Sequence, residues 1–375
     1  MADDTVFHPH FPWSRLVGAQ TLSSTYDTVS PFSSPQRALC PHNGLVYVLD
    51  SGNHRVQALA AADGVLKHEF GGRGAERGQL ECPLDIALGC HALYVSDSGN
   101  QRVEAFSFDG KHLGTVARND GSRGSVNRPT GLAVGRDRLF IADSNEHRVQ
   151  CYALLPRDST PLALRSVLAH SGVAKFVGSF CLPTAPTEPG LDWPHGVAVY
   201  GDELFVCDSG HHRISVWDAR DGGFVRTLVE GKERCRAPYG VAACAESVFV
   251  TFCSSRWVRE FPRHADAQAG SFPAPRRTFA MRQQNGVLAF VSADATGRLL
   301  VCDGGTHAVH AHVPPTARVR RWRVVARLVA VLVLAHKRAC ERLYAPGGGG
   351  YEAAANSFAA AVCASGGTAA YESGG

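Results

Sequence analysis

The chain has 375 residues, of which 45% are hydrophobic and 19% charged, and it contains 39 glycines. This composition excludes a disordered, collagen-like or coiled-coil chain, because each of those classes has a different bias in composition. The net charge of +4 is too small to indicate wholesale binding of nucleic acid or membrane, so any basic surface must be local.

The N-terminal residues, MADDTVFHPHFPW, carry acids where a secretory signal has basic residues followed by an apolar run. Twelve cysteines are present, but no C-x-x-C occurs and no cysteine has a histidine at zinc-finger spacing. We therefore interpret the cysteines as small buried hydrophobic residues in a reducing compartment, and we predict a cytoplasmic protein.

A unit of about 45 residues is repeated along the chain, a period typical of propellers and solenoids. The clear copies follow a D-S-G-N-x-R-V core, complete in the first two and varied in the other two: LVYVLDSGNHRVQAL (45–59), LYVSDSGNQRVEAF (93–106), LFIADSNEHRVQCY (139–152) and LFVCDSGHHRISVW (204–217). Two weaker copies follow at 248–261 and 299–312. A Pro-x-Gly-Val-Ala motif precedes each copy and is clearest at 129, 194 and 238, and an insertion at about 155–193 separates the third and fourth copies.

The repeated segments have the pattern of strands. They are apolar or alternating over four to six residues, rich in Val, Ile, Phe and Tyr, and bounded by Asp, Ser, Gly and Asn. Each unit is interpreted as four short strands, and no sustained helical period occurs before residue 318. Six such units predict an all-β fold, a six-bladed β-propeller of four-stranded blades.

The D-S-G-N-x-R-V core preceded by P-x-G-V-A resembles the NHL repeat, which forms six-bladed propellers in the TRIM-NHL proteins and in relatives such as the amidating lyases. The resemblance covers roughly residues 35–313, and four of the copies match well. It implies a face that binds RNA or protein partners, in a ubiquitin-pathway or RNA-regulatory context. The chain lacks RING and B-box Cys/His pairs, so intrinsic ligase activity is not expected.

An aspartate at the end of the second strand of each unit is predicted to accept N–H bonds across the turn and to meet the arginine five residues later. The complete pairs are Asp50 with Arg55, Asp97 with Arg102, Asp143 with Arg148, and Asp208 with Arg213. In the fifth copy Phe252 and Trp257 replace both members, as expected if an unpaired buried charge is costly. In the sixth copy Asp303 remains while Ala308 replaces the arginine.

Four segments are predicted. Residues 1–34 form an N-terminal segment in which PWSRLVGA (12–19) supplies the closing strand of the last blade, with RVRRWRVVA (318–326) as the rival. Residues 35–315 form the propeller, 316–345 a basic amphipathic segment, and 346–375 a low-complexity, disordered Gly/Ala-rich tail. The apolar part of 319–343 is too short to span a membrane, so this stretch either packs on the propeller or lies on an anionic membrane surface.

The predicted binding face carries the loops that enter the first strands and the turns between second and third strands. His195 and Tyr239 lie near the channel mouth, where their rings are expected to stack unpaired bases. Arginines and one lysine occupy the connections between blades, although solvated loop arginines explain the same pattern. The predicted set is Arg73, Arg77, Arg118, Arg123, Arg128, His195, Lys232, Arg234, Arg236, Tyr239 and Arg282, with Arg276 and Arg277 expected on the same face.

Catalysis is not expected. The chain has no G-x-S-x-G, H-E-x-x-H or P-loop motif. A zinc or calcium centre needs several converging ligands, but the channel mouth offers only His195 and Asp85. The turn histidines are interpreted as solvent-facing: His54, His147, His211, His212 and His307. We predict a non-catalytic scaffold without metal or cofactor that binds a protein or single-stranded RNA, with a metal-dependent lyase or lactonase as the alternative.

Overall fold

The computed structural model describes residues 32–39, 44–60, 64–89, 91–154, 174–180, 190–231, 235–253, 255, 257–264, 273–280, 288–293, 299–303 and 308–312. The chain divides into one compact unit of residues 1–314 and a second of residues 315–375. The described residues belong to the first unit, and their regular structure consists of β-strands and short 3-10 turns. None of them lies in a helix long and apolar enough to cross a membrane.

Five sheets have four strands each, and neighbouring strands are antiparallel and follow chain order. Blade 1 comprises β1 (Pro35–Leu39), β2 (Leu45–Asp50), β3 (Arg55–Ala60) and β4 (Leu66–Gly71). Blade 2 comprises β5 (Pro83–Leu88), β6 (Leu93–Asp97), β7 (Arg102–Phe106) and β8 (His112–Arg118). Blade 3 comprises β9 (Pro129–Gly135), β10 (Arg138–Asp143), β11 (Arg148–Ala153) and β12 (Lys175–Phe180).

Blade 4 comprises β13 (Pro194–Tyr200), β14 (Glu203–Asp208), β15 (Arg213–Asp218) and β16 (Phe224–Glu230). Blade 5 comprises β17 (Pro238–Ala243), β18 (Ser247–Phe252), β19 (Trp257–Pro262) and β20 (Arg277–Ala280). A further sheet has three strands, β21 (Leu288–Ala293), β22 (Leu299–Asp303) and β23 (Ala308–His312). The structure therefore confirms an all-β propeller, but its described residues form five complete four-stranded blades and not the six predicted from the sequence.

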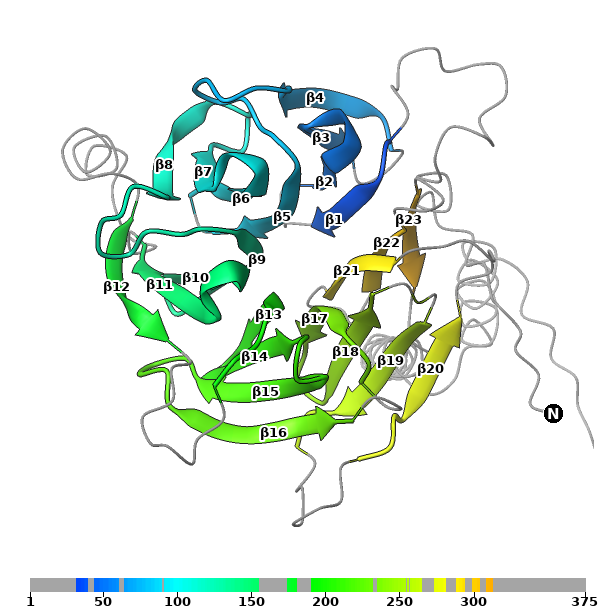
Figure 1. Ribbon diagram of the computed structural model, residues 1–375. Coiled ribbons are helices and arrows are strands. Elements are labelled where there is room, and N and C mark those ends of the chain that lie inside the picture. Colours follow the sequence, from blue (N-terminus) through cyan, green and yellow to red (C-terminus); the bar gives the residue numbers. More distant parts are fainter. Residues whose placement is uncertain are drawn as a thin grey trace, which may run out of the picture. The chain divides into compact units, whose positions relative to one another are not determined.

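The sheets are arranged around a common axis, with the first strand of each sheet innermost (Figure 1). Each first strand contacts the first strand of the next sheet, and β21 returns to contact β1. Buried side chains fill this closing junction, where Val46 and Val48 of β2 share a cluster with Leu300 and Cys302 of β22. The three-stranded sheet thus packs between blade 5 and blade 1.

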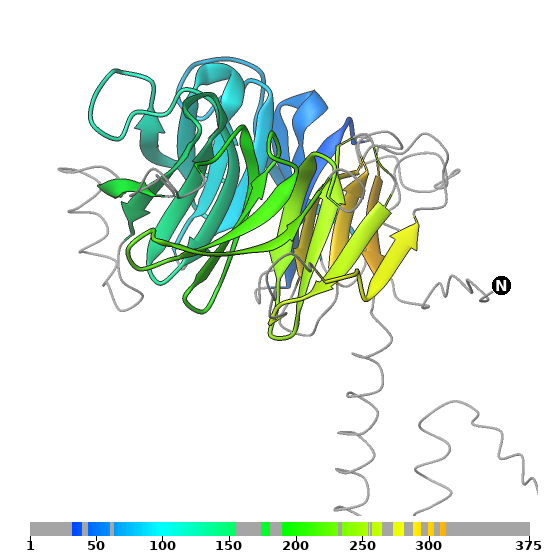
Figure 2. The ribbon, with the colours of Figure 1, turned by 60° about the horizontal axis from the view of Figure 1, so that its bottom comes forward.

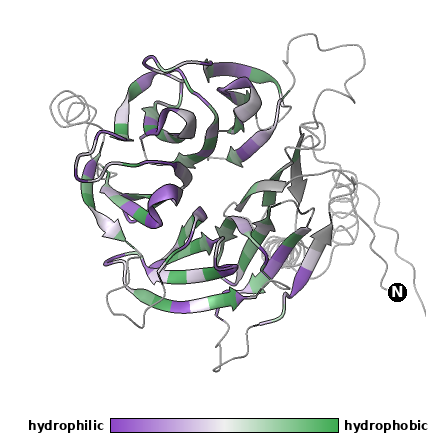
Figure 3. Cartoon of the chain, in the orientation of Figure 1, coloured by the Kyte–Doolittle hydropathy of each residue, from purple (hydrophilic) through white to green (hydrophobic). Residues whose placement is uncertain are grey.

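The hydrophobic core lies between neighbouring sheets. Phe140 of β10 packs with Leu204 and Trp217 of blade 4, and Tyr47 of β2 packs with Phe106 of blade 2. Hydrophobic residues concentrate along the strands and hydrophilic residues at the turns (Figure 3). Each blade therefore buries its faces against its neighbours, because one four-stranded sheet has no core of its own.

Two opposite faces of the ring are formed by the turns, and the strands run between them (Figure 2). On one of them, 3-10 turns follow the second strands of blades 1 to 3 at Ser51–Asn53, Ser98–Asn100 and Ser144–Glu146. The residue after each of these turns is left-handed, with φ of 56° at His54, 53° at Gln101 and 51° at His147. The left-handed residue reverses the chain so that the third strand pairs with the second.

Candidate binding surface

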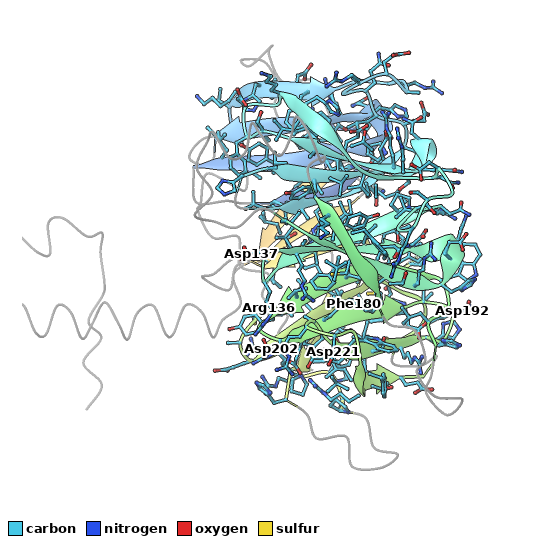
Figure 4. The ribbon with its side chains drawn as sticks, turned by 90° about the vertical axis from the view of Figure 1, so that its left-hand side faces the viewer. Arg136, Asp137, Phe180, Asp192, Asp202 and Asp221 are labelled. Carbon is cyan, nitrogen blue, oxygen red and sulfur yellow. The ribbon has the colours of Figure 1, made fainter. Side chains whose placement is uncertain are left out.

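The 3-10 turns and the connections that enter the first strands lie on one face, which we call the turn face. Gly72 N donates to His54 O at 2.8 Å, and Asn119 N donates to Gln101 O at 3.0 Å. These bonds hold the end of each fourth strand beside the turn of its own blade. Asp192 marks the turn face in Figure 4, and the hairpin residues Arg136, Asp137 and Asp202 lie on the opposite, hairpin face.

In blades 1 to 4, a buried carboxylate anchors the connection on the turn face. In blade 2, Asp97 accepts the backbone N–H of Glu81 at 2.6 Å and the side-chain amide of Asn100 at 2.8 Å. The equivalent N–H donors in the other blades are Ser33 at 2.6 Å, Asn127 at 2.9 Å and Asp192 at 2.8 Å. The carboxylate therefore holds the incoming connection, whereas the sequence suggested that it holds the N–H groups of the turn.

The paired arginines complete this anchor. Arg102 Nε donates to Asp97 at 2.7 Å, and its Nη atoms donate to Ala75 O at 2.8 Å and Gln79 O at 2.8 Å. The ion pairs in the other blades are Arg55 with Asp50 at 3.0 Å, Arg148 with Asp143 at 3.4 Å and Arg213 with Asp208 at 2.7 Å. These charges are already bonded within the protein, so they do not belong to the surface offered to a partner.

In blade 5 both charges are absent. Phe252 ends β18 and is buried, while Trp257 begins β19 and is 37% exposed. Arg259 lies over the Phe252 ring, with Cζ 5.2 Å from its centroid. Asp303 and Ala308 lie at the corresponding ends of β22 and β23, and their side chains are outside the described residues.

Serine hydroxyls join neighbouring blades. The serine after each paired aspartate donates to the carbonyl of the proline that begins the next blade: Ser51 to Pro83, Ser98 to Pro129, Ser144 to Pro194 and Ser209 to Pro238. In blade 5, Cys253 occupies the position of this serine, and β21 of the next sheet begins at Leu288 rather than at a proline. The Asp-Ser dipeptide shared by the four clear repeats is the sequence signal that could have indicated these bonds.

Three turn histidines also join blades, a role that the prediction of solvent-facing side chains did not include. Nδ1 accepts a backbone N–H of the next blade in each case: His54 from Cys82 at 3.0 Å, His147 from Trp193 at 3.2 Å and His212 from Ala237 at 3.1 Å. His211 instead lies 3.0 Å from the Asp208 carboxylate. His307 lies outside the described residues.

At the ring axis, the motif glycine is needed in blades 3 and 4. A Cβ on Gly131 would overlap His195 O, and one on Gly196 would overlap Tyr239 O. In blades 1 and 2 the same motif position holds Arg37 and Asp85 instead.

These two side chains form a buried ion pair between the neighbouring first strands of blades 1 and 2. Arg37 Nη1 lies 3.3 Å from Asp85 Oδ2, and Arg37 Nε donates to Ser292 Oγ of β21 at 2.9 Å. Asp85 also accepts the Leu132 N–H of blade 3 at 2.7 Å. Burial raises the pKa of Asp85 to about 6, although the Arg37 charge opposes this shift. The pair therefore connects the closing sheet with blades 1, 2 and 3.

The rings of His195 and Tyr239 contact each other near this pair in a tilted arrangement, with centroids 5.0 Å apart, and the Tyr239 ring lies 5.2 Å from that of Phe290. Burial, followed by the Arg128 charge, lowers the pKa of His195 to about 4, and burial raises the pKa of Tyr239 to about 12. Both rings are thus neutral near pH 7. Because each ring already contacts another, this geometry favours internal packing over the base stacking that the sequence suggested.

Four of the predicted arginines on the turn face contact either a carboxylate or an aromatic ring. Arg73 pairs with Glu81 at 3.2 Å and Arg118 with Asp120 at 2.9 Å. Arg123 lies over Phe176 and Arg128 over Trp193, each with Cζ 6.0 Å from the ring centroid. Arg77 and Arg236 are also exposed in these connections, whereas Lys232, Arg234 and Arg282 lie outside the described residues.

Arg276 and Arg277 lie on the hairpin face, contrary to the sequence prediction. Arg276 N donates to Glu260 O at 2.7 Å, and Arg276 Nη1 donates to Glu246 O beside the hairpin that joins β17 to β18. The reason is topological: β20 starts at Arg277, and a fourth strand starts where the antiparallel third strand ends.

An exposed tryptophan stands at the seam of blades 3 and 4. Trp193 is 43% exposed, carries Arg128 over its ring and meets the His147 ring edge-on at 5.9 Å. His147 Nδ1 is also 3.0 Å from Asp192 Oδ1. We call Arg128, His147, Asp192 and Trp193 the Trp193 cluster. The sequence reading did not include Trp193 or Asp192, although an aromatic residue before the motif proline is unique to this blade.

Comparisons with known families point to the same two blades. A family model described as the NHL repeat matches residues 126–152 and 191–217, which include the inner strands of blades 3 and 4. The human E3 ubiquitin-protein ligase NHLRC1 is 31% identical over 97 residues, 25% of this chain and 24% of the relative. The rat protein of that name is 36% identical over 109 residues, 28% of this chain and 23% of the relative. The matches thus span about a quarter of these relatives.

Solved structures share the fold. A chain of a nidogen/laminin complex aligns with a TM-score of 0.50 and 16% identity, covering 70% of this chain and 88% of that one. A catalytically inactive virginiamycin B lyase from Staphylococcus aureus with quinupristin aligns with a TM-score of 0.50 and 11% identity, covering 78% and 85%. At these identities the likeness supports the propeller architecture alone.

Proposed function

Because the NHL repeat matches two blades of this propeller, we infer that the chain is a non-catalytic binding module that recognises another protein on its turn face. The Trp193 cluster carries this proposal. Tryptophan and arginine are the residues most enriched among those that dominate binding energy at protein interfaces. Here an exposed indole is held by the Arg128 guanidinium and the His147 ring, so little side-chain entropy is lost when a partner covers it.

The chemistry around the indole defines the kind of partner. Arg128 offers a cation on the indole face, and the Asp192 carboxylate lies 3.0 Å from His147 Nδ1, the atom that accepts the Trp193 N–H. An apolar or aromatic side chain next to a carboxylate would match this arrangement, since it covers the indole and pairs with Arg128. The similarity to proteins named E3 ubiquitin-protein ligase supports a ubiquitin-pathway context, in which this propeller would recognise a protein without itself being the ligase.

Single-stranded RNA is the weaker candidate ligand. Arg73 and Arg118 are paired with carboxylates, and the rings of His195 and Tyr239 contact each other. RNA recognition relies instead on unpaired cations and on ring faces open to bases. The described residues at the channel mouth also bond or stack among themselves, which does not favour the lyase or lactonase alternative.

The test compares two exposed aromatic residues on opposite faces. Tyr200 ends β13 on the hairpin face, is 37% exposed and lies under Arg263 at 4.5 Å, so Tyr200→Ala is a matched control for Trp193→Ala. Both variants and the wild type are incubated with one nuclease-treated cell extract, and bound proteins are quantified by mass spectrometry. We expect proteins that bind the wild type and Tyr200→Ala but not Trp193→Ala.

A captured protein is then purified and titrated against all three chains. Loss of a central tryptophan contact should cost about 2 kcal/mol or more, roughly a 30-fold weaker Kd. Equal binding by Trp193→Ala and the wild type would contradict the proposal. No Trp193-dependent capture from the nuclease-treated extract, together with wild-type binding of single-stranded RNA that falls steeply with added salt, would assign the surface to RNA instead.

A further inference from the structure

Three metal-binding side chains of different types gather at the seam of blades 1 and 2. His54 belongs to the turn of blade 1, and Glu81 and Cys82 enter blade 2. His54 Nδ1 lies 3.9 Å from Glu81 Oε1, and Cys82 Sγ lies 3.7 Å from the same oxygen. The ligand atoms of all three residues lie within 4.8 Å of one another.

These distances are close to those of a zinc site. Zinc binds cysteine sulfur at about 2.3 Å and histidine nitrogen or carboxylate oxygen at about 2.0–2.2 Å, so tetrahedral ligands stand roughly 3.4–3.7 Å apart. The separations involving Glu81 exceed this range by a few tenths of an ångström or less. A thiolate in the set also disfavours Mg²⁺ and Ca²⁺, which take oxygen ligands.

Two other seams between blades contain the equivalent histidine without the cluster, so they show what the histidine does by itself. His147 and His212 accept the same kind of backbone N–H as His54 does. The residue that donates this N–H is Trp193 at one seam and Ala237 at the other, so this hydrogen bond between blades does not require a cysteine. The bond between the histidine and the backbone therefore does not account for the Cys82 thiol, which donates a hydrogen bond to Glu81 Oε1 beside His54.

The Glu81 carboxylate is oriented so that one oxygen remains on the cluster side. Arg73 Nε contacts Oε2 at 3.2 Å, while Oε1 is the atom nearest to His54 and Cys82. Glu81 is 28% exposed and Arg73 is 75% exposed, so the site is reached directly from the turn face. An incoming cation would replace solvent rather than core atoms.

We propose that His54, Glu81 and Cys82 form a surface site for Zn²⁺, with three protein ligands and a fourth position open to water or to a group of a bound partner. His54 Nδ1 accepts the Cys82 N–H at 3.0 Å without metal. Coordination through Nδ1 exchanges this hydrogen bond for a metal bond, which moderates the affinity. The cation links blade 1 to blade 2, far along the chain from the Trp193 cluster and independent of it.

The repeats themselves supply variants that should fold. Ser34 occupies the position of Cys82 in blade 1, with φ of 46° against 45°, so Cys82→Ser places a residue found there naturally. Gln101 occupies the position of His54 in blade 2, with φ of 53° against 56°, which makes His54→Gln the matched change for the second ligand. Cys253→Ser alters another exposed cysteine and is the control.

The full chain is titrated with Co²⁺ and followed by its thiolate-to-cobalt charge-transfer absorption, and Zn²⁺ is then added to displace the Co²⁺. We expect the band in the wild type and Cys253→Ser, its loss in Cys82→Ser, and at least a tenfold weaker Co²⁺ affinity in His54→Gln. Zn²⁺ should raise the Tm of the wild type and leave that of Cys82→Ser unchanged. A wild type without the band, or an unchanged band in Cys82→Ser, would overturn the proposal.

Discussion

Single residues on the turn face act mainly as links between segments. Asp97 is fully buried, yet it bonds an incoming backbone N–H, the Asn100 amide and Arg102. Burial raises its pKa even though these bonds lower it. Removing one partner of such a pair leaves a buried charge without compensation, which explains why blade 5 replaces both members together.

The lowered pKa of His195 predicts how the stability of the fold depends on pH. Its pKa is lowered from about 6.5 to about 4 in the folded chain, first by burial and then by the Arg128 charge. The unfolded chain therefore binds more protons between these values, and this residue's contribution to stability is lost as the pH falls from above 6.5 to 4. The wild type should lose stability relative to His195→Gln over that window, as measured by urea denaturation at several pH values.

Asp85 changes the stability with pH in the opposite direction, so the experiment on His195 must account for it. Its folded pKa of about 6 is above the ordinary 3.8, so its contribution is present at low pH and lost as the pH rises through 6. The wild-type curve should consequently be shallow between pH 4 and 6.5, and only the difference between variants isolates each residue. A difference curve for His195→Gln that stays flat below pH 6.5 would show that His195 is not held neutral.

At the scale of the element, neighbouring first strands make contact near the axis in two different ways. Blades 3 and 4 use a motif glycine so that neighbouring backbones can approach, whereas blades 1 and 2 use the Arg37–Asp85 ion pair. The pair replaces close backbone contact by a charged link that also reaches Ser292 of β21.

Arg37→Gly alone should destabilise the chain by about 3–5 kcal/mol, because the buried Asp85 loses its cation and must stay unpaired or take up a proton. The Arg37→Gly/Asp85→Gly double variant restores the motif glycine in both blades and should be more stable than the single variant, as measured by Tm. Full recovery is not expected, since the Leu132 N–H loses its acceptor. A double variant less stable than Arg37→Gly would mean that the ion pair is not the reason for the loss.

At the scale of the whole molecule, closure depends on the three-stranded sheet. β21 contacts β1, and β22 shares a buried cluster with β2, so this sheet completes the ring. The segments predicted to supply its fourth strand, 12–19 and 318–326, lie outside the described residues, as do 316–345 and 346–375. That strand remains a proposal.

Deleting residues 1–20 should lower the Tm sharply if 12–19 provides the closing strand, because the outer edge of β23 then loses its backbone partner. A chain ending at residue 315 is the matched comparison, since it removes 318–326 and leaves the N-terminal segment. A Tm that falls only in this second deletion would assign the strand to 318–326 and reject the N-terminal closure.

The sequence by itself determined the repeated strands, the sharing of one face by the turns and interblade connections, and the aspartate and arginine positions that pair in blades 1 to 4. A local repeat specifies these features, because strand alternation and a paired charge five residues away act within one blade. Only the tertiary structure decided which residues meet across blades: Ser51 with Pro83, His54 with Cys82, and Arg37 with Asp85 and Ser292. It also moved Arg276 and Arg277 to the hairpin face and exposed Trp193 beside Arg128. These contacts join positions tens to hundreds of residues apart, so their partners are set by the closure of the ring rather than by the pattern within a repeat.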